Sequence, residues 1–223
     1  MGNAVSNPCC GRERLDKDAP CMPLRRITAL QDARVHFIND SPMMCILRDN
    51  LTDIKSGNFV IKDVNGITLF QVDGLQKGPR RLLLPGGTVH AMIERSSGEE
   101  WNCYVGDERR MTVVRRVVAN NTVFLVHVLP EPFPMRGKQT NLPLPSLSVR
   151  GDFASKDFWM FDCSDLHGRK VAHASRGLPE NSGLQPQKGM YVVEVAPGLD
   201  VALVLAVALI VDDSFGGAGG KQV

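Results

Sequence analysis

The segment PGLDVALVLAVALIVDD, residues 197–213, carries the strongest structural signal in the chain. Its alanines and leucines favour an α-helix, and Asp200 stands where it can accept hydrogen bonds from the first helical turn. The valines and the isoleucine favour a strand, which leaves a strand as the alternative. We predict a helix that begins close to Asp200.

The length of this segment separates a core helix from a membrane helix. Val201 to Val211 are apolar without interruption, and at about 1.5 Å per residue they would span ~17 Å of a ~30 Å hydrocarbon layer. Asp212 and Asp213 follow directly, so a tail anchor is the disfavoured alternative. Because the helix has no polar face, other elements must enclose it. We therefore expect Leu199–Val211 to be a buried core helix.

The remainder of the chain consists of short apolar runs separated by turn residues. Asn65-Gly66, Pro85-Gly86-Gly87 and Asn120-Asn121 are typical turn sequences between such runs. Strands repeated every 8 to 12 residues are typical of a sandwich or a barrel. Strands are predicted at residues 35–38, 44–47, 58–63, 67–72, 81–84, 89–93, 101–105, 111–118, 122–129, 147–151, 158–162, 170–174 and 190–195.

The predicted elements form one domain with a tail at each end. We expect a flexible tail at 1–30, a barrel domain at 31–215 and a second flexible tail at 216–223. Residues 130–146 contain five prolines and are predicted to be a loop. A weak internal echo relates residues 59–74 to residues 158–177, since each reads as strand, Asp, turn glycine, strand and glycine. It suggests a sheet made from two related halves.

Composition excludes several functional classes. The apolar content is 43% and the net charge is +2, which is not the strong basic excess of a nucleic-acid-binding protein. The six cysteines form no C-x-x-C pair and the five histidines lack metal-ligand spacing, so we expect neither a metal site nor a cofactor. No apolar signal segment follows Met1, and we expect free thiols in a cytoplasmic protein.

Four motifs carry a resemblance to a known family, and they are Phe59-x-Ile61-x-Asp63-x-x-Gly66-x-x-Leu69-Phe70-x-Val72, Val149-x-Gly151-x-Phe153, Gly168-x-x-Val171-Ala172 and Tyr191-x-Val193-x-Val195-x-Pro197-Gly198-x-Asp200-x-Ala202-Leu203. Together they resemble the LURP-one-related family, which shares the tubby-like C-terminal fold and is distantly similar to phospholipid scramblases. The likeness covers residues 32–213 and implies a closed, twelve-stranded antiparallel barrel around a central hydrophobic C-terminal helix. It implies no catalytic residues, and we expect no enzymatic activity. The turn Leu84–Gly87 departs from the acidic turn usual in the family, and the proline-rich loop looks like an insertion.

The N-terminus carries an acylation pattern. Met1 to Ser6 fit M-G-x-x-x-[ST], the pattern for N-myristoylation of Gly2, and Cys9 and Cys10 lie within reach of a palmitoyl transferase. One acyl chain binds membranes marginally, whereas two anchor stably. The pattern predicts a lipoprotein at the inner face of the plasma membrane or of an endomembrane. The alternative is an unmodified tail.

Basic residues on a predicted loop are the best candidates for a phospholipid-binding patch. Lys77, Arg80 and Arg81 lie close together in sequence, and the tubby-like resemblance implies that such residues could bind phosphoinositide headgroups. The alternative is an ordinary solvated surface. Further basic pairs occur at residues 25–26, 109–110 and 115–116.

These features support one functional hypothesis over two others. We expect a monomeric, membrane-anchored, non-enzymatic protein that binds phosphoinositides or a protein partner. A scramblase-like lipid transporter is the alternative, and it requires the C-terminal helix to enter the bilayer. An enzyme with a polar pocket inside the barrel is the third possibility.

Overall fold

The computed structural model describes residues 40–48, 58–74, 78–134, 141–164, 168–177 and 189–215. These residues form twelve strands followed by one helix. The elements are β1 (Met43–Arg48), β2 (Phe59–Asp63), β3 (Thr68–Gly74), β4 (Arg80–Leu83), β5 (Val89–Ser97), β6 (Glu100–Val105), β7 (Glu108–Val118), β8 (Asn121–Pro134), β9 (Leu147–Asp152), β10 (Asp157–Asp162), β11 (Lys170–Ser175), β12 (Met190–Val195) and α1 (Val201–Phe215).

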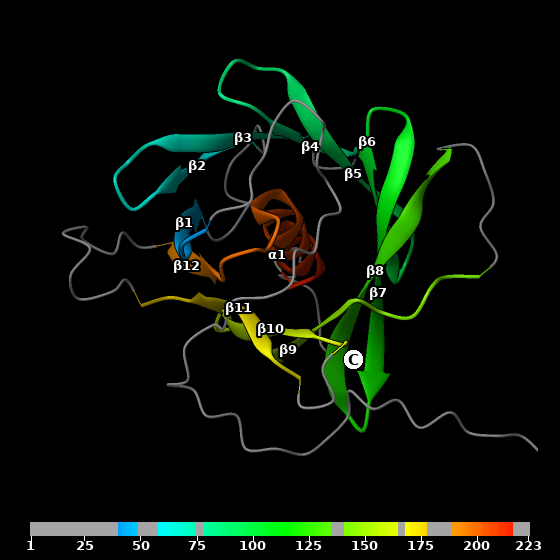
Figure 1. Ribbon diagram of the computed structural model, residues 1–223. Helices are drawn as coiled ribbons and strands as arrows, with labels where there is room; N and C mark the ends of the chain where they lie inside the picture. The colour runs from blue at the N-terminus through cyan, green and yellow to red at the C-terminus, as the bar shows by residue number, and fades with distance from the viewer. Residues whose placement is uncertain are drawn as a thin grey trace, which may run out of the picture.

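The strands form a closed antiparallel barrel. Each strand pairs with its neighbours in sequence, and the barrel closes where β1 pairs with β12 from Met43↔Val195 to Arg48↔Met190. Figure 1 shows α1 at the centre of the ring of strands. The predicted fold class is therefore confirmed. The predicted strand at 35–38 and both predicted tails, 1–30 and 216–223, lie outside the described residues.

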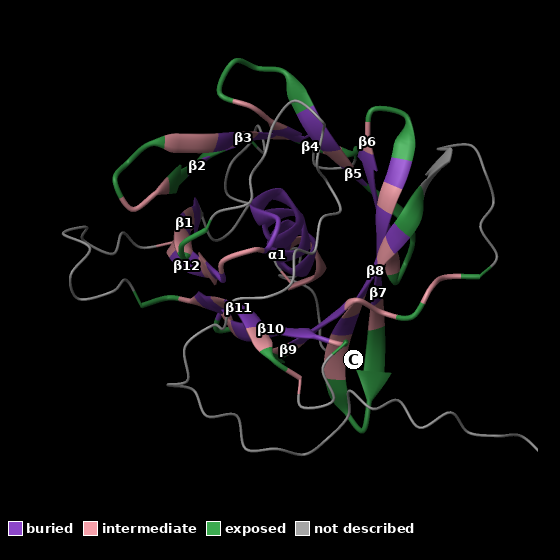
Figure 2. Cartoon of the chain, viewed as in Figure 1, coloured by how far each residue is buried: buried purple, intermediate pink, exposed green. Residues whose placement is uncertain are grey.

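The C-terminal segment is a helix buried on every side. The side-chain carboxylate of Asp200 accepts hydrogen bonds from the backbone N–H groups of Ala202 and Leu203, at 2.9 and 3.3 Å, and so caps the first turn. Residues 201–212 are all buried, which Figure 2 shows as a continuous purple helix. The helical prediction is confirmed. Within the described residues, no helix has the length and apolarity needed to span a membrane.

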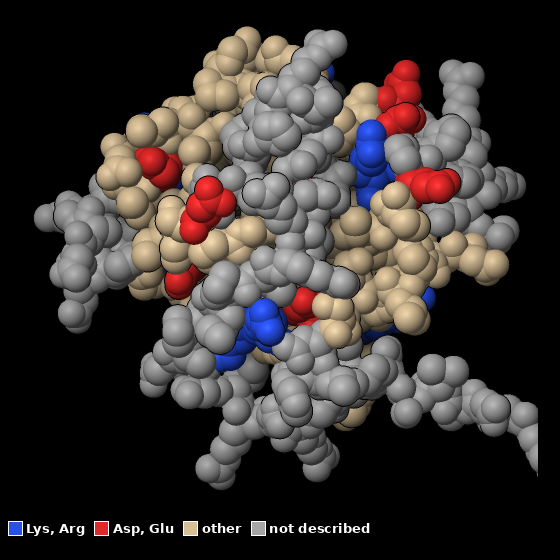
Figure 3. Space-filling model, viewed as in Figure 1, with Lys and Arg blue, Asp and Glu red and all other residues tan. Residues whose placement is uncertain are grey.

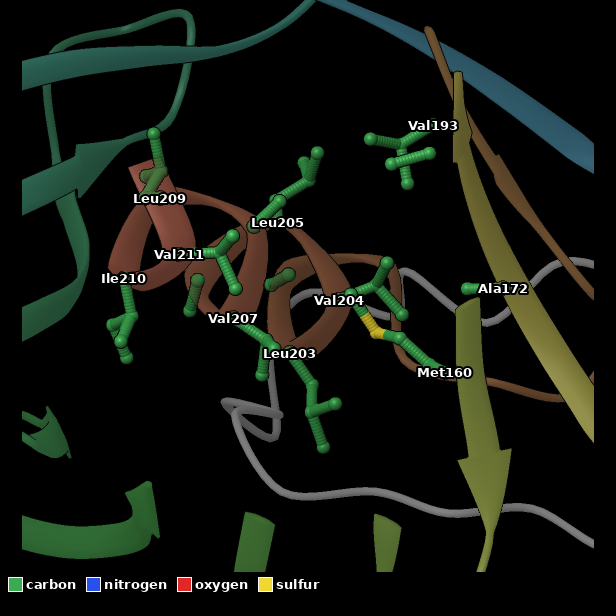
Figure 4. Packing of buried hydrophobic residues seen from close by; sticks show 14 of the residues in the cluster. Met160, Ala172, Val193, Leu203, Val204, Leu205, Val207, Leu209, Ile210 and Val211 are labelled. Carbon is green, nitrogen blue, oxygen red and sulfur yellow. The ribbon is translucent and has the colours of Figure 1, made fainter. Parts of the chain in front are cut away.

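The core forms between this helix and the inward-facing side chains of the strands. In β2 and β3 the inward residues Phe59, Ile61, Phe70 and Val72 are buried, while their neighbours in sequence are more exposed. Figure 4 shows the side chains of α1 projecting in several directions toward the surrounding strands, which present residues such as Met160, Ala172 and Val193. One apolar core therefore joins all parts of the barrel.

Four hairpins carry a register shift at a matching position. The shift follows Ile61 in the β2–β3 hairpin, Leu82 in β4–β5, Cys103 in β6–β7 and Met160 in β10–β11. Each of these four residues belongs to the core and is almost fully buried. β-Bulges increase strand twist and bending, which a sheet needs to curl around a helix. The echo between residues 59–74 and 158–177 thus corresponds to two hairpins with the same bulge.

Two predicted boundaries differ from the structure. The turn between β7 and β8 is formed by Ala119 and Asn120, both at positive φ, rather than by Asn120-Asn121. Strand β8 continues to Pro134, into the range predicted as a proline-rich loop. In the described part of the sheet, β9 pairs with β8 only opposite Phe124–Val126, so the later prolines lie on an edge where a missing N–H costs little.

Gly151 is the position where the fold should tolerate a side chain least. Its φ is +143°, and an added Cβ would clash with the Asp157 carbonyl oxygen and lie 2.5 Å from the Phe158 Cα. Because backbone strain and overpacking add, we expect Gly151→Ala to lower the free energy of unfolding by about 3 kcal/mol. Denaturant unfolding measures this change.

The matched control is Gly86→Ala in the turn between β4 and β5. An added Cβ at Gly86 meets nothing within 4 Å, and its φ is not positive. We expect a change within about 0.5 kcal/mol. Equal effects of the two substitutions would contradict the close approach of β9 and β10 at Gly151.

Candidate functional site

The C-terminal end of α1 carries two carboxylates that need cationic partners from the barrel. The last turn of the helix, residues 212–215, begins with these two carboxylates, Asp212 and Asp213, and contains no basic residue. Carboxylates at a helix C-terminus interact unfavourably with the helix dipole. Cations supplied by the surrounding strands and turns must therefore stabilise them.

Asp212 lies in a buried polar cluster. Its carboxylate accepts one hydrogen bond from the Nζ of Lys156, in the turn between β9 and β10, and one from the hydroxyl of Tyr191 on β12 at 2.7 Å. All three side chains are almost fully buried. Lys156 adopts a φ of +61°, and its Nζ lies 5.8 Å from the centre of the Tyr191 ring. We call Lys156, Tyr191 and Asp212 the helix-end cluster; it ties the helix to two parts of the barrel.

Arg80, one of the predicted phosphoinositide-binding residues, binds the second carboxylate at the same end of the helix. Its Nε donates to Asp213 at 2.6 Å, and its side chain is only 14% exposed. Burial raises the pKa of Asp213, while the hydrogen bond from Arg80 and its charge lower it. Arg80 therefore compensates a helix carboxylate.

Arg81 lies on the opposite face of β4, because successive residues of a strand alternate. Its side chain is 48% exposed and forms an ion pair with Asp73, its cross-strand neighbour on β3. The structure therefore separates Arg80 from Arg81. Lys77 lies outside the described residues, as do Gly2, Cys9, Cys10 and the basic pair at 25–26.

In the other two basic pairs, the two arginines also lie in different environments. Arg110 pairs with Glu108, and Arg109 is buried beside Asn102. The Arg115 guanidinium lies 5.2 Å from the centre of the Phe215 ring, at the end of α1, whereas Arg116 is exposed. Phe215 packs in turn against the aromatic rings of Phe124 and Phe153.

The described residues offer no activated nucleophile among the buried thiols. Burial raises the pKa of Cys45 to about 12, and burial also raises the pKa of Cys103. Both thiols are therefore protonated near neutral pH and unreactive. Burial lowers the pKa of His127, whose Nδ1 lies 2.7 Å from the Pro143 carbonyl oxygen.

Metal binding also lacks a structural basis in the described part of the chain. No group of three or more His, Cys, Asp or Glu side chains there is arranged to hold a metal ion. The carboxylate of Asp162 instead accepts hydrogen bonds from the backbone N–H and hydroxyl of Ser164, both at 2.8 Å. Asp162 therefore organises the turn that follows β10.

Sequence reasoning missed the helix-end cluster. The signal that could have found it was the Asp212-Asp213 pair directly after a fully apolar helix, since buried carboxylates need cationic or hydrogen-bonding partners. The local sequence pattern could not identify those partners. Lys156 is distant in sequence from both Tyr191 and the helix.

The helix-end cluster provides a stability test. Lys156→Met removes the cation and leaves the Asp212 carboxylate buried, so we expect the free energy of unfolding to fall by roughly 3 kcal/mol or more. Lys62→Met on the exposed face of β2 is the matched control and should change it by less than about 0.5 kcal/mol.

A second variant separates loss of the ion pair from loss of packing. Combining Lys156→Met with Asp212→Asn removes the uncompensated charge, and we expect it to recover part of the lost stability. Urea unfolding measures both changes. A double variant less stable than Lys156→Met alone would contradict a buried ion pair at this position.

Comparison with known proteins gives two agreeing results. The model of the family described as LURP-one-related matches residues 43–212, more than half of the chain. An X-ray structure of a protein from Arabidopsis thaliana superposes with a TM-score of 0.53 at 25% sequence identity, covering 79% of this chain and 93% of that chain. A search of curated proteins finds no match. The family match and the barrel with its enclosed helix together show that this chain belongs to the LURP-one-related family.

Proposed function

We propose that the chain is a non-enzymatic lipoprotein that is held at the inner face of a cellular membrane and binds anionic lipid headgroups there. The observation that carries this proposal is the N-terminal sequence, in which Gly2 and Ser6 fit the myristoylation pattern and Cys9 and Cys10 follow. The family match begins at residue 43, so this pattern precedes the matched domain. An acyl transferase could then modify the tail without disturbing the barrel.

Headgroup binding would use small groups of basic residues. On the face shown in Figure 3, basic and acidic side chains are interspersed over the described residues, in keeping with a net charge of +2. Arg81 is a suitable residue because its ion pair with Asp73 is exposed, and exposed ion pairs contribute little stability. A lipid phosphate could replace Asp73 as its partner, with Lys77 close by in sequence.

The interior of the barrel favours a non-enzymatic role. The helix occupies the space at which an enzyme would hold a polar pocket, and residues 201–212 are buried against the strands. The scramblase-like alternative requires this helix to leave the barrel. That movement would break the Asp200 cap and expose the helix-end cluster, so it has less support.

Acylation can be tested by metabolic labelling with an alkyne myristate. We expect wild type to be labelled and to sediment with membranes, and Gly2→Ala to lose both properties. Cys9→Ser with Cys10→Ser should keep the label but release much of the protein, because one acyl chain anchors marginally.

Asn7→Ala is the control for this experiment, since it leaves Gly2, Ser6, Cys9 and Cys10 in place. It should behave as wild type. Unlabelled wild type, or equal labelling of Gly2→Ala, would rule out myristoylation at Gly2.

Headgroup binding can be tested on unacylated full-length protein by flotation with vesicles that contain phosphoinositide. Arg81→Glu replaces an attraction of about 1 kcal/mol with a repulsion, so we expect at least a roughly fivefold loss of vesicle binding. Lys62→Glu makes the same change of charge at an exposed position on β2 and should have a smaller effect. If the two variants lose equal amounts of vesicle binding, net charge alone determines binding, and a specific site at Arg81 is contradicted.

A further inference from the structure

The hairpin of β7 and β8 extends beyond its neighbours in the barrel. These are the two longest strands of the described residues, with 11 and 14 residues. Strand β6 pairs with β7 only as far as Val114, and β9 pairs with β8 only as far as Phe124. Residues 116–123 therefore pair only with one another in the described sheet, and the hairpin end projects at the bottom of Figure 1. We call residues 116–121 the hairpin tip.

Two adjacent apolar side chains are exposed in the hairpin tip. Val117 is 66% exposed and Val118 is 41% exposed. Adjacent residues of a strand point to opposite faces, so the tip presents an apolar side chain on each face. Within the described residues, neither β6 nor β9 pairs with this part of the hairpin.

The charge next to these valines is positive. Arg116 is exposed at the start of the hairpin tip. Arg115, beside it, lies over the Phe215 ring, whereas Arg109 and Arg110 lie at the far end of β7, where Arg109 is buried and Arg110 pairs with Glu108. Apolar side chains at the end of a hairpin, with an exposed arginine beside them, match a membrane interface in which acyl chains lie beneath anionic headgroups.

The backbone of the tip is a two-stranded ribbon closed by a two-residue turn. Val117 pairs with Thr122 and Val118 with Asn121, and only Ala119 and Asn120 form the turn. Only the N–H and C=O groups that face the partner strand are hydrogen-bonded within the hairpin, and those on the two outer edges lie beyond the pairing of β6 and β9. Backbone groups without a partner are costly in hydrocarbon, so the tip would enter the hydrated interfacial layer and no deeper.

The hairpin tip and Arg81 lie at the same end of the barrel. Arg80, next to Arg81, binds Asp213, and Arg115, next to the tip, lies over the ring of Phe215. Asp213 and Phe215 both belong to the last turn of α1. A membrane facing this end of the barrel could therefore meet both elements.

We propose that the hairpin tip inserts Val117 and Val118 into the interfacial layer of a membrane containing anionic lipid, with Arg116 at the headgroups. This inference rests on the proposed function and adds a second contact between the barrel and the membrane. The contact is independent of acylation, because it uses only the folded domain.

The test uses unacylated full-length protein and vesicles of phosphatidylcholine with and without phosphatidylserine. Val117→Ser with Val118→Ser should reduce binding to the anionic vesicles by at least about fivefold. Val60→Ser with Val89→Ser alters two exposed valines on β2 and β5 and should leave binding near the wild-type level. Loss of binding in the tip variant alone supports insertion.

A fluorescence measurement reports insertion directly. In Val118→Trp, anionic vesicles should shift the new indole emission to the blue, and brominated lipid should quench it; Val60→Trp should show neither change. A tip variant that binds as wild type, or an unshifted indole, overturns the inference. If Arg81→Glu reduces binding in the same assay, headgroup binding stands without tip insertion; if wild type binds no vesicle, both proposals fail.

Discussion

A helix without a polar face has to be enclosed, and this requirement governs the whole molecule. Residues 201–212 are buried all round, so strands must surround α1 completely and present apolar side chains toward it. The backbone groups and charges at the ends of the helix must be satisfied inside the same enclosure. Asp200 does this at the beginning of the helix, and Lys156 and Tyr191 do it for Asp212 at the end.

Closing a sheet around so narrow a core requires strong curvature, and the strands supply it in a repeated way. Six strand pairs shift register, and in four hairpins the shift directly follows a buried core residue near the turn, which adds twist at the same rim of the barrel. At the opposite rim, Gly151 lets β9 and β10 approach more closely than a side chain would allow. The shape of the barrel thus depends on local irregularities as much as on regular pairing.

The enclosed helix also determines where binding can occur. Since α1 fills the interior, polar interactions with other molecules are left to the rim and the outer surface. Basic pairs in strands are divided by this geometry: Arg80 and Arg115 turn inward to the end of the helix, whereas Arg81 and Arg116 remain at the surface. One arginine of each pair therefore contacts the last turn of the helix, and the other lies at the surface of the barrel.

Local sequence determined most of the secondary structure and the class of fold. Alternating apolar residues and turn dipeptides mark the strands, and an apolar segment too short for a bilayer marks a core helix, because these signals depend on near neighbours in the chain. Tertiary structure alone decided that Lys156 and Tyr191 meet Asp212. It also decided that β8 extends past Pro130, because an edge without a partner tolerates proline. Strand alternation places Arg80 and Arg81 on opposite faces of β4. Only the tertiary structure shows that Arg80 is the one that faces inward, where it reaches Asp213 at the end of the helix.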